Sequence, residues 1–502
     1  MSGNPAGRGM APPAVWGGGM VRSRIRCHTV AESGWRAMPA TTAFECPPRS
    51  KDIRRARTIV KTSPAAYPHG ELLRVLGAGF GLAVVIGGTV GLGILRSPAV
   101  VADHAGAPSV TLMLWVLGGL YALLAASSYA DLATSIARSG GVYVYARHAM
   151  GDRAGFLFGW ADVFSTCSSS AFAALGFAEF AGLLWPTLQP WKTPLAVLAI
   201  AVFTAVQWRG VRFGSVVEQV GASVKALLFL GVIAGLLFLA PAAPPALTES
   251  RDMTLPGAVA VVLAMQLVLG AYDGWAGGIY FTGEDRDPAR NPPRAILGGL
   301  LLVILIYLLM NLALLRVLPF EDLAASPLPV ADAARRWLGE GGATLVTGIA
   351  ALSLLPLLGG TLMVSSRIAH AMASDGLLPG RLADVNPRGT PTPALLCVAA
   401  AALALVFASG GVLNLMLGIG AFFAVFTYVG GFVSLLVLRR RHPELPRPFR
   451  AWWYPWSTWL VLLGGLALLA GVVIGAPRES LVAVAVLAIA LPAHRLFSSR
   501  AQ

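Results

Sequence analysis

The chain has 502 residues, of which 56% are hydrophobic and only 12% are charged, and its mean hydropathy is +0.70. This composition excludes an ordinary soluble domain and indicates a protein that crosses a bilayer many times, since each crossing needs roughly 20 apolar residues. The hydrocarbon interior offers no partner to stray backbone polar groups, and no segment shows the alternation of a barrel strand. The predicted fold class is therefore all-α.

Twelve apolar segments are interpreted as transmembrane helices, which makes the chain a polytopic membrane protein. In chain order they lie near 75–103, 108–137, 155–186, 192–207, 214–240, 255–282, 293–318, 342–374, 392–408, 411–438, 457–475 and 479–496. The bounds of such segments are uncertain by several residues, because hydropathy does not define where a helix ends.

The net charge of +14 would fit a nucleic-acid-binding protein, but its distribution follows the predicted membrane segments. If the N-terminus is cytoplasmic, the loops on that side carry eighteen Lys and Arg residues and the opposite loops carry six. The positive-inside rule then predicts a plasma (inner) membrane protein with both termini in the cytoplasm. We therefore expect the lipid bilayer as a partner and no nucleic acid.

Residues 1–70 are rich in Gly, Pro, Ala, Ser and Arg and lack hydrophobic periodicity. They are predicted to be a disordered, basic cytoplasmic tail. The cysteines lie in this tail or inside the predicted spans, so no disulfide-linked companion chain is expected: Cys27, Cys46, Cys167 and Cys397.

Glycine clusters interrupt the first and the sixth apolar segments. The first contains "GGTVGLG" at 87–93 with Pro98 beyond it, and the sixth contains "LGAYDGWAGG" at 269–278. Paired interruptions are typical of secondary transporters built from two inverted repeats. The alternative for Gly87 and Gly91 is a GxxxG packing motif. Asp273 in the second cluster would cost about 2.5–3.5 kcal/mol in hydrocarbon, which favours a polar cavity between the two breaks.

Broken helices suggest the charge of the ligand. An unwound segment exposes backbone amides, which attract a carboxylate, and backbone carbonyls, which attract an ammonium group. The pattern therefore predicts a site for a small zwitterion such as an amino acid.

Several motifs together resemble the amino acid/polyamine/organocation (APC) transporters, and most closely the L-type amino acid transporter branch and its bacterial relatives. They are "GGTVGLGILRSP", "YADLATSIARSGGVYVY", "QWRGVRFGSVVEQVGASVK", "GAYDGWAGGIYFTGEDRDPARNPPRAI", "SSRIAHAMASDGLLP" and "RRRHPELPRPFR". The resemblance implies the LeuT-type fold, with one inverted repeat over 71–240 and a second over 255–438. A basic cytoplasmic loop (439–456), two further helices (457–496) and a cytoplasmic end (497–502) would follow.

The resemblance also implies the substrate site. Its positions in the first break are Thr89, Gly91, Leu92, Gly93 and Ile94, and those in the second are Gly270, Ala271, Tyr272, Asp273, Gly274 and Trp275. Two of them depart from the L-type pattern. Leu92 replaces a small polar residue, and Gly270 replaces an aromatic gate, which leaves gating to an aromatic such as Trp275 or Phe422.

Lys225 lies at the position of the family's fifth-span lysine, where sodium-coupled relatives hold a sodium ion, so the resemblance implies sodium independence. Two roles stay open for Lys225: a permanent charged tether that joins spans 1, 5 and 8, or a group that exchanges a proton. Glu284 and Arg367 are candidates for the inner gate, with Asp131, Arg138 and Arg290 in its loop network. Weaker candidates for polar groups that face the cavity or the external vestibule are Glu179, Arg96, Ser353, Ser365 and Ser366.

The expected function is secondary active transport of amino acids, sodium-independent, as an exchanger or coupled to protons. Predicted spans 3, 8 and 10 show no clear midplane acid that could pair with a cationic side chain, which favours neutral substrates, and Asp273 in span 6 is the exception. The alternatives are an amino acid sensor on a transporter scaffold and a transporter of cationic amino acids or polyamines. An enzyme is not expected, nor are a cofactor, a metal or catalytic residues, because the seven histidines are scattered and no nucleophile or phosphate-binding motif is present.

Overall fold

A computed structural model describes residues 72–243, 257–410 and 412–498. Its secondary structure in these ranges is helical, with one isolated β-bridge between Leu76 and Asp285. The elements are α2 (Ala78–Thr89), α3 (Leu92–Ala105), α4 (Pro108–Ser135), α5 (Val142–Met150), α6 (Asp152–Leu184), η1 (Pro186–Trp191), α7 (Lys192–Trp208), α8 (Val211–Ala234), η2 (Gly235–Leu239), α9 (Ala258–Ala271), η3 (Trp275–Glu284), α10 (Asn291–Val317), α11 (Phe320–Ala325), α12 (Pro329–Leu338), α13 (Glu340–Ser374), η4 (Gly380–Ala383), α14 (Thr392–Ala408), α15 (Leu413–Arg441), α16 (Trp456–Gly475) and α17 (Pro477–Ser498).

The helices confirm an all-α, polytopic membrane fold. Within the described residues, ten helices are long and apolar enough to cross a membrane, and α2 and α3 form an eleventh span that bends by 47° at its break. The shorter apolar helix α14 covers the remaining predicted segment. Every one of the twelve predicted segments therefore contains helix.

The sequence did not predict three short helices that lie between spans, namely α5, α11 and α12. Each has ten residues or fewer, so hydropathy over a membrane-length window cannot detect it. The predicted tail at 1–70, with Cys27 and Cys46, lies outside the described residues. The division into two inverted repeats remains a prediction.

Both interrupted helices break where the sequence places glycine. α2 ends at Thr89, Val90 is extended, and α3 begins directly after Gly91. In the second break α9 ends at Ala271, and Gly274 has φ of +108°, a conformation that side chains with a Cβ rarely adopt. The chain then continues as the 3₁₀ helix η3.

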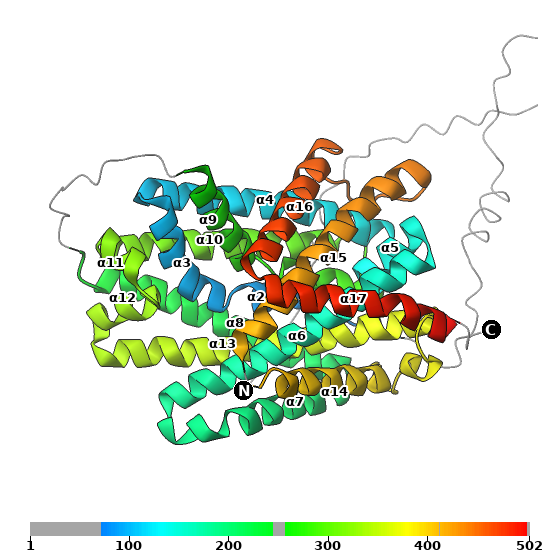
Figure 1. The fold of residues 1–502 in the computed structure, drawn as a ribbon, viewed down its shortest axis with the longest axis horizontal. Coiled ribbons are helices and arrows are strands. Elements are labelled where there is room, and N and C mark those ends of the chain that lie inside the picture. The colour runs from blue at the N-terminus through cyan, green and yellow to red at the C-terminus, as the bar shows by residue number, and fades with distance from the viewer. Residues whose placement is uncertain (1–71, 244–256, 411, 499–502) are drawn as a thin grey trace, which may run out of the picture. The chain divides into compact units, whose positions relative to one another are not determined.

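The long helix α6 packs along α13, and α7 and α14 pack against both of them (Figure 1). α2 packs against α8, α10 and η3, while α3 packs against α9, so each half of the first broken span has its own neighbours. This arrangement places the two breaks next to each other inside the bundle.

One end of the bundle gathers most of the ion pairs. Arg439 at the end of α15 pairs with Asp131 of α4, and Arg138, just beyond α4, pairs at 2.7 Å with Asp375, just beyond α13. Arg147 of α5 contacts the same Asp375 carboxylate at 2.9 Å. We call this part of the molecule the basic end.

Candidate functional site

The backbones of the two breaks touch. A Cβ added to Gly274 would lie 2.6 Å from the carbonyl carbon of Gly88, and one added to Gly93 would lie 3.0 Å from the Cα of Ala271. No side chain fits between segments at such distances, so glycine is required at the crossing. The predicted cavity therefore does not extend between Gly88 and Gly274 in this conformation.

Tyr307 of α10 joins the two broken helices. Its hydroxyl lies 2.8 Å from the carbonyl oxygen of Thr89 and 2.8 Å from that of Ala271, the last residues of α2 and α9. Both carbonyls are helix ends without an intrahelical partner. Tyr307 packs against Tyr272 and Trp115, and the Tyr272 hydroxyl donates to the carbonyl of Trp115 at 3.1 Å. A sequence search for broken helices gives no signal for this tyrosine.

The other side of the crossing is open. A Cβ at Gly91 or at Gly270 would meet no atom within 4 Å. α3 begins here, and no side chain caps its first amides. Leu92 is partly exposed at this opening, whereas Thr89 and Ile94 are buried. Free amides beside open space are what a carboxylate requires.

Asp273 already has partners in this conformation. Its Oδ1 accepts hydrogen bonds from the amide of Gly274, at 2.8 Å, and from the hydroxyl of Tyr428 on α15. The ring of Tyr428 stacks on Trp275 with centroids 5.2 Å apart. Tyr428 thus closes over the second break, a contact that the sequence analysis did not predict.

Lys225 is buried between three spans. Its Nζ donates to the carbonyl oxygens of Gly87, on α2, and Ser353, on α13, each at 2.8 Å. This is the geometry that a tether between spans 1, 5 and 8 requires. Glu218 lies seven residues earlier on α8 and is also buried, and its carboxylate faces Gly87, Gly359 and Gly360.

Glu284 and Arg367 form a buried ion pair between η3 and α13. Two hydrogen bonds of 3.0 and 3.1 Å connect them, and their side chains are 0% and 1% exposed. The Arg367 guanidinium also lies 5.5 Å from the centre of the Phe281 ring. This pair fixes the far end of η3 to α13.

The loop network at the basic end contains two further carboxylates. Tyr143 of α5 donates to Asp375 at 2.7 Å; burial and the negative charge of Asp375 raise the pKa of the Tyr143 phenol, so it stays protonated as a donor. Asp131 accepts hydrogen bonds from Arg439, from Arg447 at 3.5 Å and from the amide of Ala451 at 2.8 Å. Arg138 thus belongs to this network, whereas Arg290 is exposed.

The remaining predicted residues lie elsewhere. Phe422 packs against Phe423 and Phe426 on its own helix. Arg96 is exposed 5.9 Å from the Phe180 ring, and Glu179 is partly buried. The hydroxyls of Ser353, Ser365 and Ser366 bond to carbonyls of their own helix.

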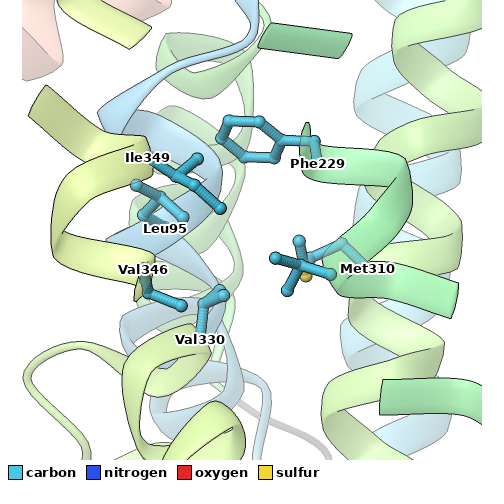
Figure 2. Close-up of a pocket in the computed structure, with 7 residues that line it drawn as sticks. Leu95, Phe229, Met310, Val330, Val346 and Ile349 are labelled. Atoms are coloured by element: carbon cyan, nitrogen blue, oxygen red, sulfur yellow. The ribbon is translucent and has the colours of Figure 1, made fainter. Parts of the chain in front are cut away.

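A narrow pocket lies beside α3 (Figure 2). Its lining consists of aliphatic side chains, one methionine and one phenylalanine: Leu95, Phe229, Val232, Met310, Val330, Val346 and Ile349. With no polar group in its lining, it cannot satisfy the charges of a zwitterion. Among the described residues, no group of three His, Cys, Asp or Glu side chains could hold a metal ion.

Crossed broken helices inside an apolar bundle define a membrane transporter of the secondary active class. The comparisons identify it further: a family model described as "Amino acid permease" matches residues 81–490, and the chain belongs to this family. It is an amino acid transporter and not an enzyme.

Similar proteins of known name are transporters and exchangers. The chain is 30% identical to the mouse b(0,+)-type amino acid transporter 1 over 79% of its own length and 83% of that protein. It is 28% identical to the serine/threonine exchanger SteT of Bacillus subtilis, over 80% of this chain and 92% of that one. The human Asc-type amino acid transporter 1 is 30% identical over 78% and 76% of the two chains.

Proposed function

We propose that the protein is a sodium-independent transporter of neutral amino acids that alternates access at the crossing of its two broken helices. The observation that carries this proposal is the uncapped start of α3 beside open space at Gly91 and Gly270. The amides of Gly91, Leu92 and Gly93 would hold the substrate carboxylate. The carbonyl ends of α2 and α9 would accept hydrogen bonds from its ammonium group when Tyr307 releases them.

Sodium independence is supported by the position of Lys225. Its ammonium group donates to carbonyl oxygens of two different spans, which are the ligands that a sodium ion would otherwise use. A fixed positive charge there removes the need for a sodium ion at this position. Of the two roles left open by the sequence, these contacts favour the tether.

Neutral substrates are favoured by the state of Asp273. The Oδ1 of its carboxylate already accepts hydrogen bonds from Tyr428 and Gly274, so a cationic side chain would have to compete with them for that oxygen in this conformation. Similar proteins include one named a serine/threonine exchanger and one named a large neutral amino acids transporter small subunit. Transport of cationic amino acids is the second candidate, because rotation of Tyr428 would expose Asp273.

We further propose that the basic end faces the cytoplasm of the plasma (inner) membrane, as the arginines of its loops imply. The protein is proposed to work without a disulfide-linked companion chain. The described cysteines, Cys167 and Cys397, lie within α6 and α14, which supports this proposal.

The experiment is uptake of labelled amino acids into proteoliposomes with and without a sodium gradient, with all twenty amino acids as competitors. Neutral amino acids should compete and sodium should have no effect. A strict sodium requirement would refute the proposed coupling. Competition by lysine and arginine alone would replace neutral with cationic substrates.

Gly91→Ala tests the position of the site. Gly91 has an extended backbone and open space around it, so the methyl group should not disturb folding. It would occupy the proposed carboxylate position and weaken apparent substrate affinity about tenfold or more, which corresponds to ~1.4 kcal/mol. The matched control is Gly231→Ala on α8, where a Cβ also meets no atom within 4 Å. Equal affinity in both variants would place the substrate elsewhere.

A further inference from the structure

Asp162 is a buried acid whose position suggests a second ligand site. It lies ten residues into α6, or about 15 Å along the helix, and its residue exposure is 3%. Its Oδ1 accepts a hydrogen bond from the hydroxyl of Tyr280 at 3.0 Å. Its Oδ2 is buried and has no hydrogen-bond partner. Within the described part of the chain, no Lys, Arg or His lies within the 4.0 Å of an ion pair with it.

The ionisable groups around Asp162 do not supply a counter-charge. Tyr280 of η3 and Tyr129 of α4 are phenols that interact with Asp162, and the phenol of Tyr428 on α15 lies near Tyr280. On α13 the Arg367 guanidinium is bound to Glu284 by two hydrogen bonds. Also on α13, His370 is buried with its Nδ1 unpartnered. On α5, the hydroxyl of Tyr145 is buried and unpartnered. A charged Asp162 would therefore be stabilised by a single phenol.

A charged carboxylate is much more costly than a neutral carboxyl group in such surroundings, because burying an uncompensated charge costs several kcal/mol. A proton on Oδ2, the oxygen that lacks a partner, would remove this uncompensated charge. Glu218, the other buried acid with an unpartnered oxygen, differs because Lys225 shares its helix face.

Tyr280 connects this acid to the moving part of a transporter. It lies on η3, which begins at Trp275 in the substrate site and ends at Glu284 in the buried ion pair with Arg367. A movement of η3 that opens the basic end would break the hydrogen bond between Tyr280 and Asp162 and admit water to the acid. Water stabilises the carboxylate, so opening would favour release of the proton.

We propose that Asp162 is a proton-binding site that couples proton entry to amino acid transport: it binds a proton when the basic end is closed and releases it when that end opens. The step is a reversible protonation of one carboxylate, with no other bond made or broken. This inference rests on the proposed transport function, and it assigns the proton to Asp162 instead of Lys225.

The test uses proteoliposomes that contain a pH-sensitive dye, with a labelled neutral amino acid outside. Two assays run in parallel: net uptake with internal acidification between about pH 6 and 8, and exchange of labelled for unlabelled amino acid, which needs no net proton movement. The wild type should acidify the interior during net uptake. Asp162→Asn, which resembles the protonated acid, should keep exchange but lose acidification about tenfold or more and lose the pH dependence.

Tyr280→Phe is the matched variant, because it removes the hydrogen bond at 3.0 Å and leaves the acid. It should still acidify the interior, with a changed pH midpoint. If Asp162→Asn does not fold, Asp162→Glu, which keeps an acid there, must retain acidification with a shifted midpoint.

Asp162→Asn or Asp162→Glu with the wild-type pH profile would overturn the proposal. Wild-type exchange with no acidification and no pH dependence would overturn it too, while leaving amino acid transport intact. Absence of both net uptake and exchange would instead refute the proposed transport function.

Discussion

Gly274→Ala is predicted to be one of the most damaging single-methyl changes in the molecule. Gly274 has φ of +108°, and its Cβ would lie 2.6, 2.7 and 2.9 Å from three backbone atoms of Gly88 and Thr89. Those neighbours are main chain and cannot rotate away, so the crossing of the two broken helices must widen.

The size of the effect follows from two contributions. An alanine in left-handed backbone costs about 1–2 kcal/mol. Overpacking against a rigid neighbour typically adds about 1–3 kcal/mol. The conformation with crossed breaks should therefore lose about 2–5 kcal/mol, which reduces its population relative to other states by a factor of roughly 30 to several thousand.

The measurements are thermal stability of the purified protein and amino acid uptake in proteoliposomes. Gly274→Ala should lower the melting temperature and abolish uptake. The matched control is Gly270→Ala on α9, where a Cβ meets no atom within 4 Å. Gly270 is the last residue but one of α9, so this change should leave the melting temperature close to the wild-type value. If the two variants melt at the same temperature, the conclusion that the main chains of the two breaks lie in close contact is wrong.

Three further predictions concern buried polar groups. Tyr307→Phe removes the one hydroxyl proton that the helix-end carbonyls of Thr89 and Ala271 share, so it should cost about 1–3 kcal/mol and slow uptake. Tyr121→Phe, which loses a bond to Val461 of α16, should affect the melting temperature and not uptake. Arg367→Gln leaves Glu284 buried and unpaired, which should lower the free energy of unfolding by about 3–5 kcal/mol. Adding Glu284→Gln to this variant should restore part of the lost melting temperature. A double variant that melts no higher than Arg367→Gln would contradict the ion pair. Lys225→Met removes two bonds from a charged donor, on the order of 3 kcal/mol. As a tether its loss should abolish uptake at every pH, whereas loss of pH dependence alone would identify a proton switch.

The sequence predicts the fold and the location of the breaks because both depend on strong local signals. Long apolar segments leave helix as the solution for the backbone in lipid. A close approach of two main chains requires glycine at Gly274 and leaves little room for a side chain at Gly88, so the glycine clusters that mark the breaks can be recognised in the sequence alone. The short helices α5 and α11 carry no comparable signal.

The contacts that surround the breaks could not be predicted in the same way. Tyr307 lies in "LLVILIYLLMNLALL", where a lone tyrosine is unremarkable in an apolar helix. Its role depends on which of its neighbours ends a helix, and this is a property of the tertiary arrangement. Tyr428 and Asp162 are similar cases, because their partners are 155 and 118 residues away along the chain.

The broken helices and the buried tyrosines solve one problem together. Breaking a helix in the membrane frees carbonyls and amides that must find partners, and a closed conformation without substrate must supply these from the protein. Tyr307 supplies a hydroxyl to the carbonyls of Thr89 and Ala271, and Tyr428 supplies one to Asp273. A phenol is suited to this task because it is uncharged and its ring packs in an apolar core. In the proposed binding mode a substrate ammonium group would compete for the same carbonyls, so its binding would weaken the contacts that hold the breaks together. This exchange of partners gives the substrate a direct means of shifting the bundle between conformations.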